Sequence, residues 1–291
     1  MSATKPLVKP FLFILPLSLL LLLLPLLSRP TLHPTLTRQL SPSSILQIRP
    51  GFRSYDDYLN LQLNKTLNPR LRHLWATRDW NRKIAVFSRF FVKLQERAFL
   101  SNTSRALCIG ARIGQEVAAL RTIGVADSIG MDLVASPPLV VQGDFHSQPF
   151  EDHSFDFEFS NVFDHALYPD RFVGEIERTL RPGGVCVLHV ALTRRADRYS
   201  ANDLYAIEGV TVLFVESDLV RVRKIDGFGL DTELVLRKKR RLRLLISSIL
   251  GSAILLLVSK PSSLTTLWIQ THLNQFKKVI NLQWLTVDSK R

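Results

Sequence analysis

Hydrophobic and polar residues follow two different periodicities in the middle of the chain. Over residues 55–100, apolar side chains recur every three to five residues with Arg and Lys between them, and Pro69 interrupts the pattern. This spacing is typical of amphipathic helices and predicts a helical N-terminal layer or a lid. From Arg105 onwards, short apolar runs alternate with amphipathic segments, which predicts strand, turn and helix in repeated order. Such alternation indicates an α/β fold with a parallel sheet.

Turn-forming residues separate the predicted elements. The strands are expected at 106–109, 128–131, 139–142, 155–160, 185–191, 219–224 and 233–237, and the connecting helices at 115–123 and 169–180. Arg181-Pro-Gly-Gly184 is expected to end the second helix, and Gly227 and Gly229 to turn the last two strands into an antiparallel hairpin at the sheet edge. In open parallel sheets, ligands bind beyond the carboxyl ends of the strands.

Charge is distributed unevenly along the chain. The net charge is +13, yet residues 56–236 carry 21 basic and 24 acidic side chains, so the excess of positive charge lies in the two flanks. Basic flanks beside apolar stretches are favoured at anionic membrane surfaces. A near-neutral middle argues against nucleic acid as the partner. The sequence therefore predicts a membrane rather than DNA or RNA.

The N-terminal flank contains an apolar run. Residues 10–27 are 18 residues without a charge, close to the length of a membrane-spanning helix. We therefore predict an N-terminal transmembrane helix at 1–27, an uncleaved signal anchor that attaches the protein to an endomembrane (endoplasmic reticulum or Golgi) in a single pass. A cleaved secretory or organelle-targeting peptide is the alternative. Residues 28–54 contain four prolines and predict an extended stalk.

The C-terminal flank, residues 241–291, is predicted to associate with the membrane as well. Residues 244–258 form an uncharged stretch of 15 residues, which is either a tilted second span or a helix in the membrane interface. A span would place the middle domain in the cytosol, whereas an interfacial helix would leave it in the lumen. The sequence leaves open both the side of the membrane and the oligomeric state.

A longer motif joins the third and fourth predicted strands. Residues 143–156 read Gly-Asp-Phe-His-Ser-Gln-Pro-Phe-Glu-Asp-His-Ser-Phe-Asp, and Arg181-Pro-Gly-Gly184 precedes the fifth strand. At this spacing the chain resembles the type-11 domain of class I S-adenosylmethionine-dependent methyltransferases, and it is similar to uncharacterised plant membrane-anchored methyltransferase-like proteins. The resemblance covers Arg105 to Leu192, and more loosely extends to Lys239. It implies that residues 101–240 form a Rossmann-like, mostly parallel seven-stranded sheet with helices on both faces, and that S-adenosyl-L-methionine is the cofactor.

Two acidic residues at strand ends suit this cofactor. A carboxylate at Asp132 can accept hydrogen bonds from both ribose hydroxyls, and one at Asp144 can accept a hydrogen bond from the adenine amino group. With the resemblance, the expected cofactor-binding residues are Gly110, Ala111, Arg112, Gly114, Asp132, Leu133, Asp144, Phe145 and Asn161.

The first turn departs from the family pattern of an acid followed by G-x-G-x-G. Cys108 stands in the place of the acid and Arg112 in the place of the central glycine, while Gly110 and Gly114 still allow a tight turn. Arg112 either pairs with the carboxylate of the cofactor or marks a turn that no longer admits it. The two hypotheses are an active methyltransferase and a non-catalytic methyltransferase-like membrane scaffold.

The fourth strand leads into the predicted acceptor side of the site. The family places residues that face the methyl group here, and His165 is the candidate general base with Asp164 as its orienting partner. A histidine that merely caps or packs is the alternative. The expected acceptor is a small molecule or a lipid-like compound. A short-chain dehydrogenase is disfavoured because no tyrosine has a lysine four residues later. Cys108 and Cys186 lie in predicted buried strands without metal-ligand spacing, so neither a metal site nor a disulfide is expected.

Overall fold

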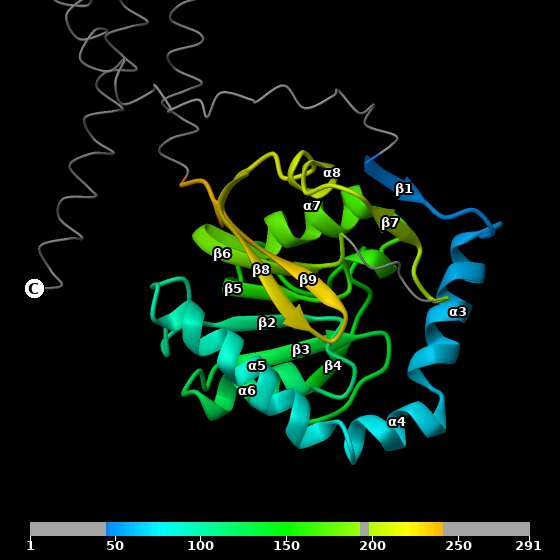
Figure 1. Ribbon diagram of the computed structural model, residues 1–291, viewed down its shortest axis with the longest axis horizontal. Coiled ribbons are helices and arrows are strands. Elements are labelled where there is room, and N and C mark those ends of the chain that lie inside the picture. Colours follow the sequence, from blue (N-terminus) through cyan, green and yellow to red (C-terminus); the bar gives the residue numbers. More distant parts are fainter. Residues whose placement is uncertain (1–44, 193–197, 241–291) are drawn as a thin grey trace, which may run out of the picture. The chain divides into compact units, whose positions relative to one another are not determined.

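The computed structural model describes residues 45–192 and 198–240, coloured in Figure 1. The predicted membrane anchor, most of the predicted stalk and the C-terminal segment lie outside these residues. None of the helices within the described ranges combines the length and apolar character that crossing a membrane requires.

The centre of the fold is a seven-stranded sheet with the order β4-β3-β2-β5-β6-β9-β8. Its strands are β2 (Ala106–Ile109), β3 (Ser128–Asp132), β4 (Val140–Gln142), β5 (Phe155–Ser160), β6 (Leu180–Val190), β8 (Ser217–Gly227) and β9 (Leu230–Lys238). The strands from β4 to β6 run parallel, and β8 and β9 are antiparallel to their neighbours. The chain leaves β2 first toward β3 and later toward β5, so the winding direction reverses there. The predicted Rossmann-like, mostly parallel seven-stranded sheet is therefore confirmed.

Helices cover both faces of this sheet, as Figure 1 shows. They are α5 (Trp80–Gln95), α6 (Gln115–Thr122), α7 (Pro169–Thr179) and the short α8 (Glu208–Thr211). In β2, Ala106 and Cys108 join the core cluster beneath α5 and α6, whereas Leu107 and Ile109 join the cluster beneath α7. Because both of its faces are buried, β2 is an unbroken apolar run rather than an alternating one.

Three helices precede the sheet where the sequence predicts helical spacing. They are α3 (Tyr55–Thr66), α4 (Pro69–Ala76) and α5. The hydroxyl of Ser54 caps α3, and Pro69 occupies the first turn of α4, where its missing N–H costs no hydrogen bond. Phe87 and Phe91 of α5 are buried against the sheet. A separate two-stranded sheet pairs β1 (Leu46–Ile48) with β7 (Asn202–Leu204).

Two details of the predicted elements differ from the structure. The strand β6 begins at Leu180, not at Val185, since Leu180 already pairs with Phe155 and the register shifts before Phe157 meets Val185. The hairpin β8–β9 is longer than expected, and its two-residue turn has positive φ at both Phe228 and Gly229. Both differences arise from pairing with a partner strand, which local sequence does not encode.

The two cysteines are buried and free. They lie on β2 and β6, with β5 between them.

Candidate functional site

A cavity of about 340 Å³ opens at the carboxyl ends of β2, β3 and β5, where the winding direction reverses. Its walls include six of the nine predicted cofactor residues and both catalytic candidates, namely Gly110, Arg112, Asp132, Leu133, Phe145, Asn161, Asp164 and His165. Ala111, Gly114 and Asp144 are not part of the walls. The structure thus brings together residues from four loops that lie far apart in the sequence.

The first turn needs glycine at both ends. Gly110 has a φ of +72° and Gly114 a φ of +95°, in the left-handed region that favours glycine. A Cβ atom on Gly110 would lie 2.4 Å from Cγ2 of Val162, and one on Gly114 would lie 2.6 Å from Cβ of Leu139. The turn therefore packs tightly against neighbouring loops and leaves its backbone exposed toward the cavity.

Asp132 ties the end of β3 to this turn. One of its carboxylate oxygens accepts a hydrogen bond of 2.8 Å from the backbone N–H of Arg112. Burial raises the pKa of Asp132, and the hydrogen bond from Arg112 opposes this rise. A carboxylate with so little water around it gains stability from further donors such as two neighbouring hydroxyl groups.

The side chain of Arg112 lies over the ring of Trp75, with the guanidinium carbon 5.8 Å from the ring centroid. It forms an ion pair of 3.1 Å with Glu116, which also accepts a hydrogen bond of 3.2 Å from Asn161. Glu116 was not among the predicted site residues. Because it lies four positions after Arg112, an ion pair between the two side chains could have been predicted from the sequence.

Asp144 faces helix α3 rather than the cavity. It accepts hydrogen bonds from the hydroxyl of Tyr55 and, at 2.9 Å, from the backbone N–H of His146. Burial raises the pKa of Asp144, but the hydrogen bonds from His146 and Tyr55 outweigh burial and the net pKa is lowered. Tyr55 also stacks on Tyr168, with ring centroids 5.5 Å apart. The role of Asp144 toward adenine stays a prediction.

Helix α3 contributes Gln62, Lys65 and Thr66 to the cavity wall, and two of them contact His165. Nε2 of His165 lies 3.1 Å from Nζ of Lys65, and Nδ1 lies 3.0 Å from Oε1 of Gln62. Since a lysine ammonium only donates, Nε2 accepts, and the imidazole proton belongs on Nδ1, which donates to Gln62. The carboxylate of Asp164 is 3.9 Å from Nε2 and accepts a hydrogen bond of 2.5 Å from Ser200. Gln62, and not Asp164, makes the hydrogen bond that orients the ring.

Several wall residues were not predicted. They are Gln62, Lys65, Thr66, Trp75, Val162, Ala191, Phe228, Gly229 and Leu230. Most of them come from α3, α4 and the β8–β9 turn, which reach the cavity only through the tertiary fold.

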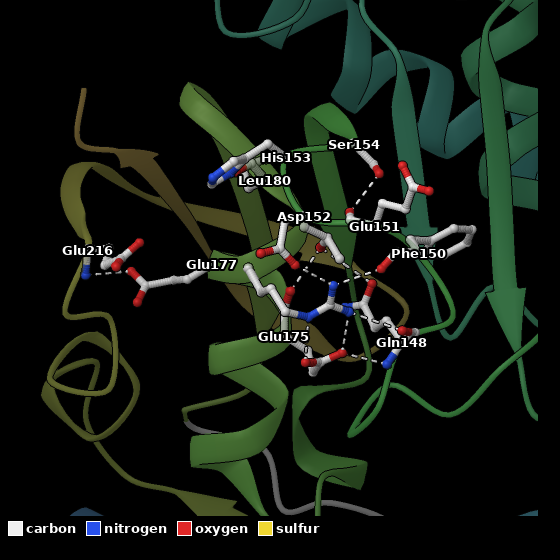
Figure 2. Close-up of polar contacts among 12 residues, drawn as sticks. Gln148, Phe150, Glu151, Asp152, His153, Ser154, Glu175, Glu177, Leu180 and Glu216 are labelled. Carbon is white, nitrogen blue, oxygen red and sulfur yellow. Dashed lines mark hydrogen bonds and ion pairs between the residues drawn. The ribbon is translucent and has the colours of Figure 1, made fainter. Parts of the chain in front are cut away.

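The best-matched motif, residues 143–156, contributes only Phe145 to the cavity. Figure 2 shows Gln148, Phe150 and Asp152 of this loop and Glu175 of α7 gathered about one guanidinium. It is the guanidinium of Arg178 on α7, which donates to the carbonyls of Gln148 (3.0 Å) and Phe150 (2.7 Å) and to the carboxylates of Asp152 (2.9 Å) and Glu175 (2.8 Å). The loop is thus held by a clamp remote from the cavity.

Comparison with known proteins agrees with this architecture. The family model described as "Methyltransferase domain" matches residues 107–188. This segment is a methyltransferase domain. The resemblance drawn from residues 143–156 and 181–184 is therefore confirmed. No curated protein has significant sequence similarity to the chain.

Solved structures share the fold of the methyltransferase domain. The 1,6-didemethyltoxoflavin-N1-methyltransferase of Burkholderia thailandensis, solved with 1,6-didemethyltoxoflavin and S-adenosylhomocysteine, is 14% identical and has a TM-score of 0.52. The match covers 66% of this chain and 93% of that one. A protein of Pyrococcus horikoshii OT3 is 16% identical with a TM-score of 0.45, over 65% of this chain and 100% of its own. At these identities the first similarity establishes the fold alone.

Proposed function

We propose that the protein is an S-adenosylmethionine-dependent methyltransferase that acts on a small-molecule or lipid-like acceptor at a membrane. The observation that carries the proposal is the single cavity in which the first turn, Asp132 and His165 meet. S-adenosylhomocysteine bound to the Burkholderia methyltransferase, which has the same fold, supports the choice of cofactor.

The residues on the cofactor side fit S-adenosylmethionine. Gly110 lies in the cavity wall, and with its positive φ and no side chain it lets a ligand approach the turn backbone closely. Asp132 would hold the ribose hydroxyls, and Leu133 and Phe145 supply apolar wall for a flat base. The cofactor would contribute an electrophilic methyl group on a sulfonium centre.

The residues on the other side would bind and orient the acceptor. Gln62 and Lys65 contact His165 in the cavity wall and would align the acceptor and exclude water, which supplies much of the rate of an in-line displacement. For an acceptor that must lose a proton, His165 would take it at Nε2, once Lys65 gives way at that atom. Gln62 holds Nδ1 and so keeps the basic lone pair on Nε2.

Attachment to a membrane rests on the basic and apolar flanks of the sequence. Two exposed sequons, at Asn64 and Asn102, allow a test of the side of the membrane. If the domain faces the lumen, the protein from cells will lose mass on deglycosylation, and Asn64→Gln with Asn102→Gln will abolish that shift. An unchanged mass favours the cytosolic side.

A non-catalytic scaffold is the second candidate, favoured by Arg112 in the place of a glycine and by the engagement of Asp144 with Tyr55. Calorimetric titration of S-adenosylhomocysteine into the full chain, together with transfer of labelled methyl groups to a membrane lipid extract and to an aqueous metabolite extract, separates the candidates. Micromolar binding and labelled product support the enzyme. A folded chain that binds no cofactor supports the scaffold.

A further inference from the structure

A buried charged network lies directly beneath the first turn of the methyltransferase domain. Glu116, on the first turn of α6, is only 2% exposed. Its Oε1 accepts from Nη2 of Arg112 at 3.1 Å and from Nδ2 of Asn161 at 3.2 Å. Its Oε2 is buried without a hydrogen-bond partner, and so is Nε of Arg112. Unpartnered buried charged groups are costly and mark positions where a ligand or water completes the network.

A second cation lies near this network. Lys83 of α5 is 6% exposed, and its pKa is lowered to about 8 by burial and by the nearby charge of Arg112, although the charges of Glu116 and Asp79 oppose this shift. The guanidinium of Arg112 lines the cavity and makes an ion pair with Glu116. A ligand that brings a carboxylate of its own would give this guanidinium a further partner, because a guanidinium binds carboxylates strongly.

Cys108 on β2 faces the core cluster that α5 and α6 cover. The pKa of the Cys108 thiol is raised by burial first and by the negative charge of Glu116 second. Cys108 stands where the family pattern has an acid, and Glu116 brings a buried carboxylate to the same face of the sheet from helix α6.

We propose that Glu116 takes over the place of the absent strand acid and, through Arg112 and Asn161, positions the subsite for the amino-acid end of S-adenosylmethionine. This inference rests on the proposed function. Arg112 and Asn161 line the cavity and Glu116 does not, so Glu116 is a positioning residue. Arg112 binds the carboxylate of the ligand. Because Glu116 holds Nδ2 of Asn161, the amide oxygen remains to accept from the ligand's ammonium.

Comparing the affinities of two ligands distinguishes binding at this subsite from binding in the rest of the cavity. S-adenosylhomocysteine has the amino-acid end, and 5′-methylthioadenosine lacks it but keeps the base, the ribose and the sulfur. Calorimetry on the full chain is expected to show that Glu116→Gln weakens S-adenosylhomocysteine binding by about tenfold and methylthioadenosine binding by less than about twofold. Asn161→Ala is expected to show the same selectivity, and Glu151→Gln, a change at an exposed glutamate, to alter neither affinity.

A rescue variant tests the relocation of the acid. Adding Cys108→Asp to Glu116→Gln is expected to restore most of the lost affinity for S-adenosylhomocysteine. Equal losses for both ligands, or an unchanged affinity for S-adenosylhomocysteine in folded Glu116→Gln and Asn161→Ala, would overturn the inference. If the wild-type chain binds neither ligand, the proposed function itself fails. Thermal melting of each variant without ligand controls for folding.

Discussion

Two loops of the methyltransferase domain differ in how well they match the family and in what they do. Residues 143–156 match the family motif closely, yet only Phe145 reaches the cavity, and Arg178 holds the loop from the side of α7. Residues 110–116 depart from the pattern at Arg112, yet Gly110 and Arg112 form the cavity wall. The closely matched loop, residues 143–156, is thus mainly structural, whereas the poorly matched loop, residues 110–116, contributes to the cavity wall.

The physical reason lies in the backbone of each loop. A loop without regular structure leaves carbonyl groups unpaired, and these need donors when they are buried. Arg178 supplies donors to two such carbonyls and to two carboxylates at once. The first turn needs no such clamp, because its backbone N–H groups donate to Met131, Ala111 and Asp132. The buried polar atoms without a partner near it belong to the side chains of Arg112 and Glu116.

The largest effect is expected when the clamp is removed. Arg178→Met should lower the free energy of unfolding by about 3 kcal/mol, because the carbonyls of Gln148 and Phe150 lose a donor and Glu175 keeps the backbone N–H of Gln148 but loses its ion pair. Urea denaturation measures this, and affinity for S-adenosylhomocysteine should change less than about threefold. Arg171→Met, at an exposed arginine of the same helix, is the control. Abolished binding in a folded Arg178→Met variant would contradict the separation of the two loops.

The next effect concerns the ligand rather than stability. Asp132→Ala should weaken S-adenosylhomocysteine binding by about 1.5–3 kcal/mol, since it removes a charged acceptor from the cavity wall. Asp152→Ala, in the clamped loop, should leave calorimetric affinity unchanged. If wild type and Asp132→Ala bind S-adenosylhomocysteine with equal affinity, Asp132 does not bind the ribose.

A smaller, pH-dependent effect is expected beneath the clamped loop. Burial raises the pKa of Glu158 from 4.5 to about 8, although Thr179 donates a hydrogen bond to it. Between these two values the folded state keeps a proton on Glu158 that the unfolded state releases. The contribution of Glu158 to the free energy of unfolding is therefore greatest below about pH 4.5 and decreases as the pH rises toward 8. In the Glu158→Gln variant, the free energy of unfolding measured by urea denaturation should decrease by about 1–2 kcal/mol less between pH 5 and 8 than in the wild type. Parallel pH curves for the two proteins would show that Glu158 does not titrate this way.

The smallest effect tests the contact between Tyr55 and Asp144. Tyr55→Phe frees one carboxylate oxygen of Asp144, so S-adenosylhomocysteine should bind about 0.5 kcal/mol more tightly if that oxygen accepts from adenine. Weaker binding, measured by the same calorimetry, would mean that Tyr55 orients Asp144 instead of competing for it. Leu59→Ile on the same helix serves as a conservative control.

The centre of the sheet was predictable because β2 and most of β6 are buried on both faces. The run at 106–109 and the acid at Asp132 stand out in the sequence, and the fold places them at the centre of the sheet and at the cavity wall. Gly110 and Gly114 were predicted from spacing, and their positive φ values explain the requirement for glycine.

The remaining site residues were hidden because they depend on packing between distant segments. Gln62 and Lys65 contact His165 from about a hundred positions earlier in the chain. Helical periodicity in α3 gives no information about which side chain faces a cavity that later strands create. Arg178 is likewise an ordinary helix position in the sequence, and only the docking of α7 reveals its clamp.

Hydrogen exchange of the full chain, with and without S-adenosylhomocysteine, reports on both loops at once and so tests their different roles. We expect slower exchange in residues 110–116 and 131–134 when the ligand is bound, with residues 146–156 unchanged. Protection confined to residues 146–156, or protection nowhere at a saturating ligand concentration, would show that the two loops do not differ in this way.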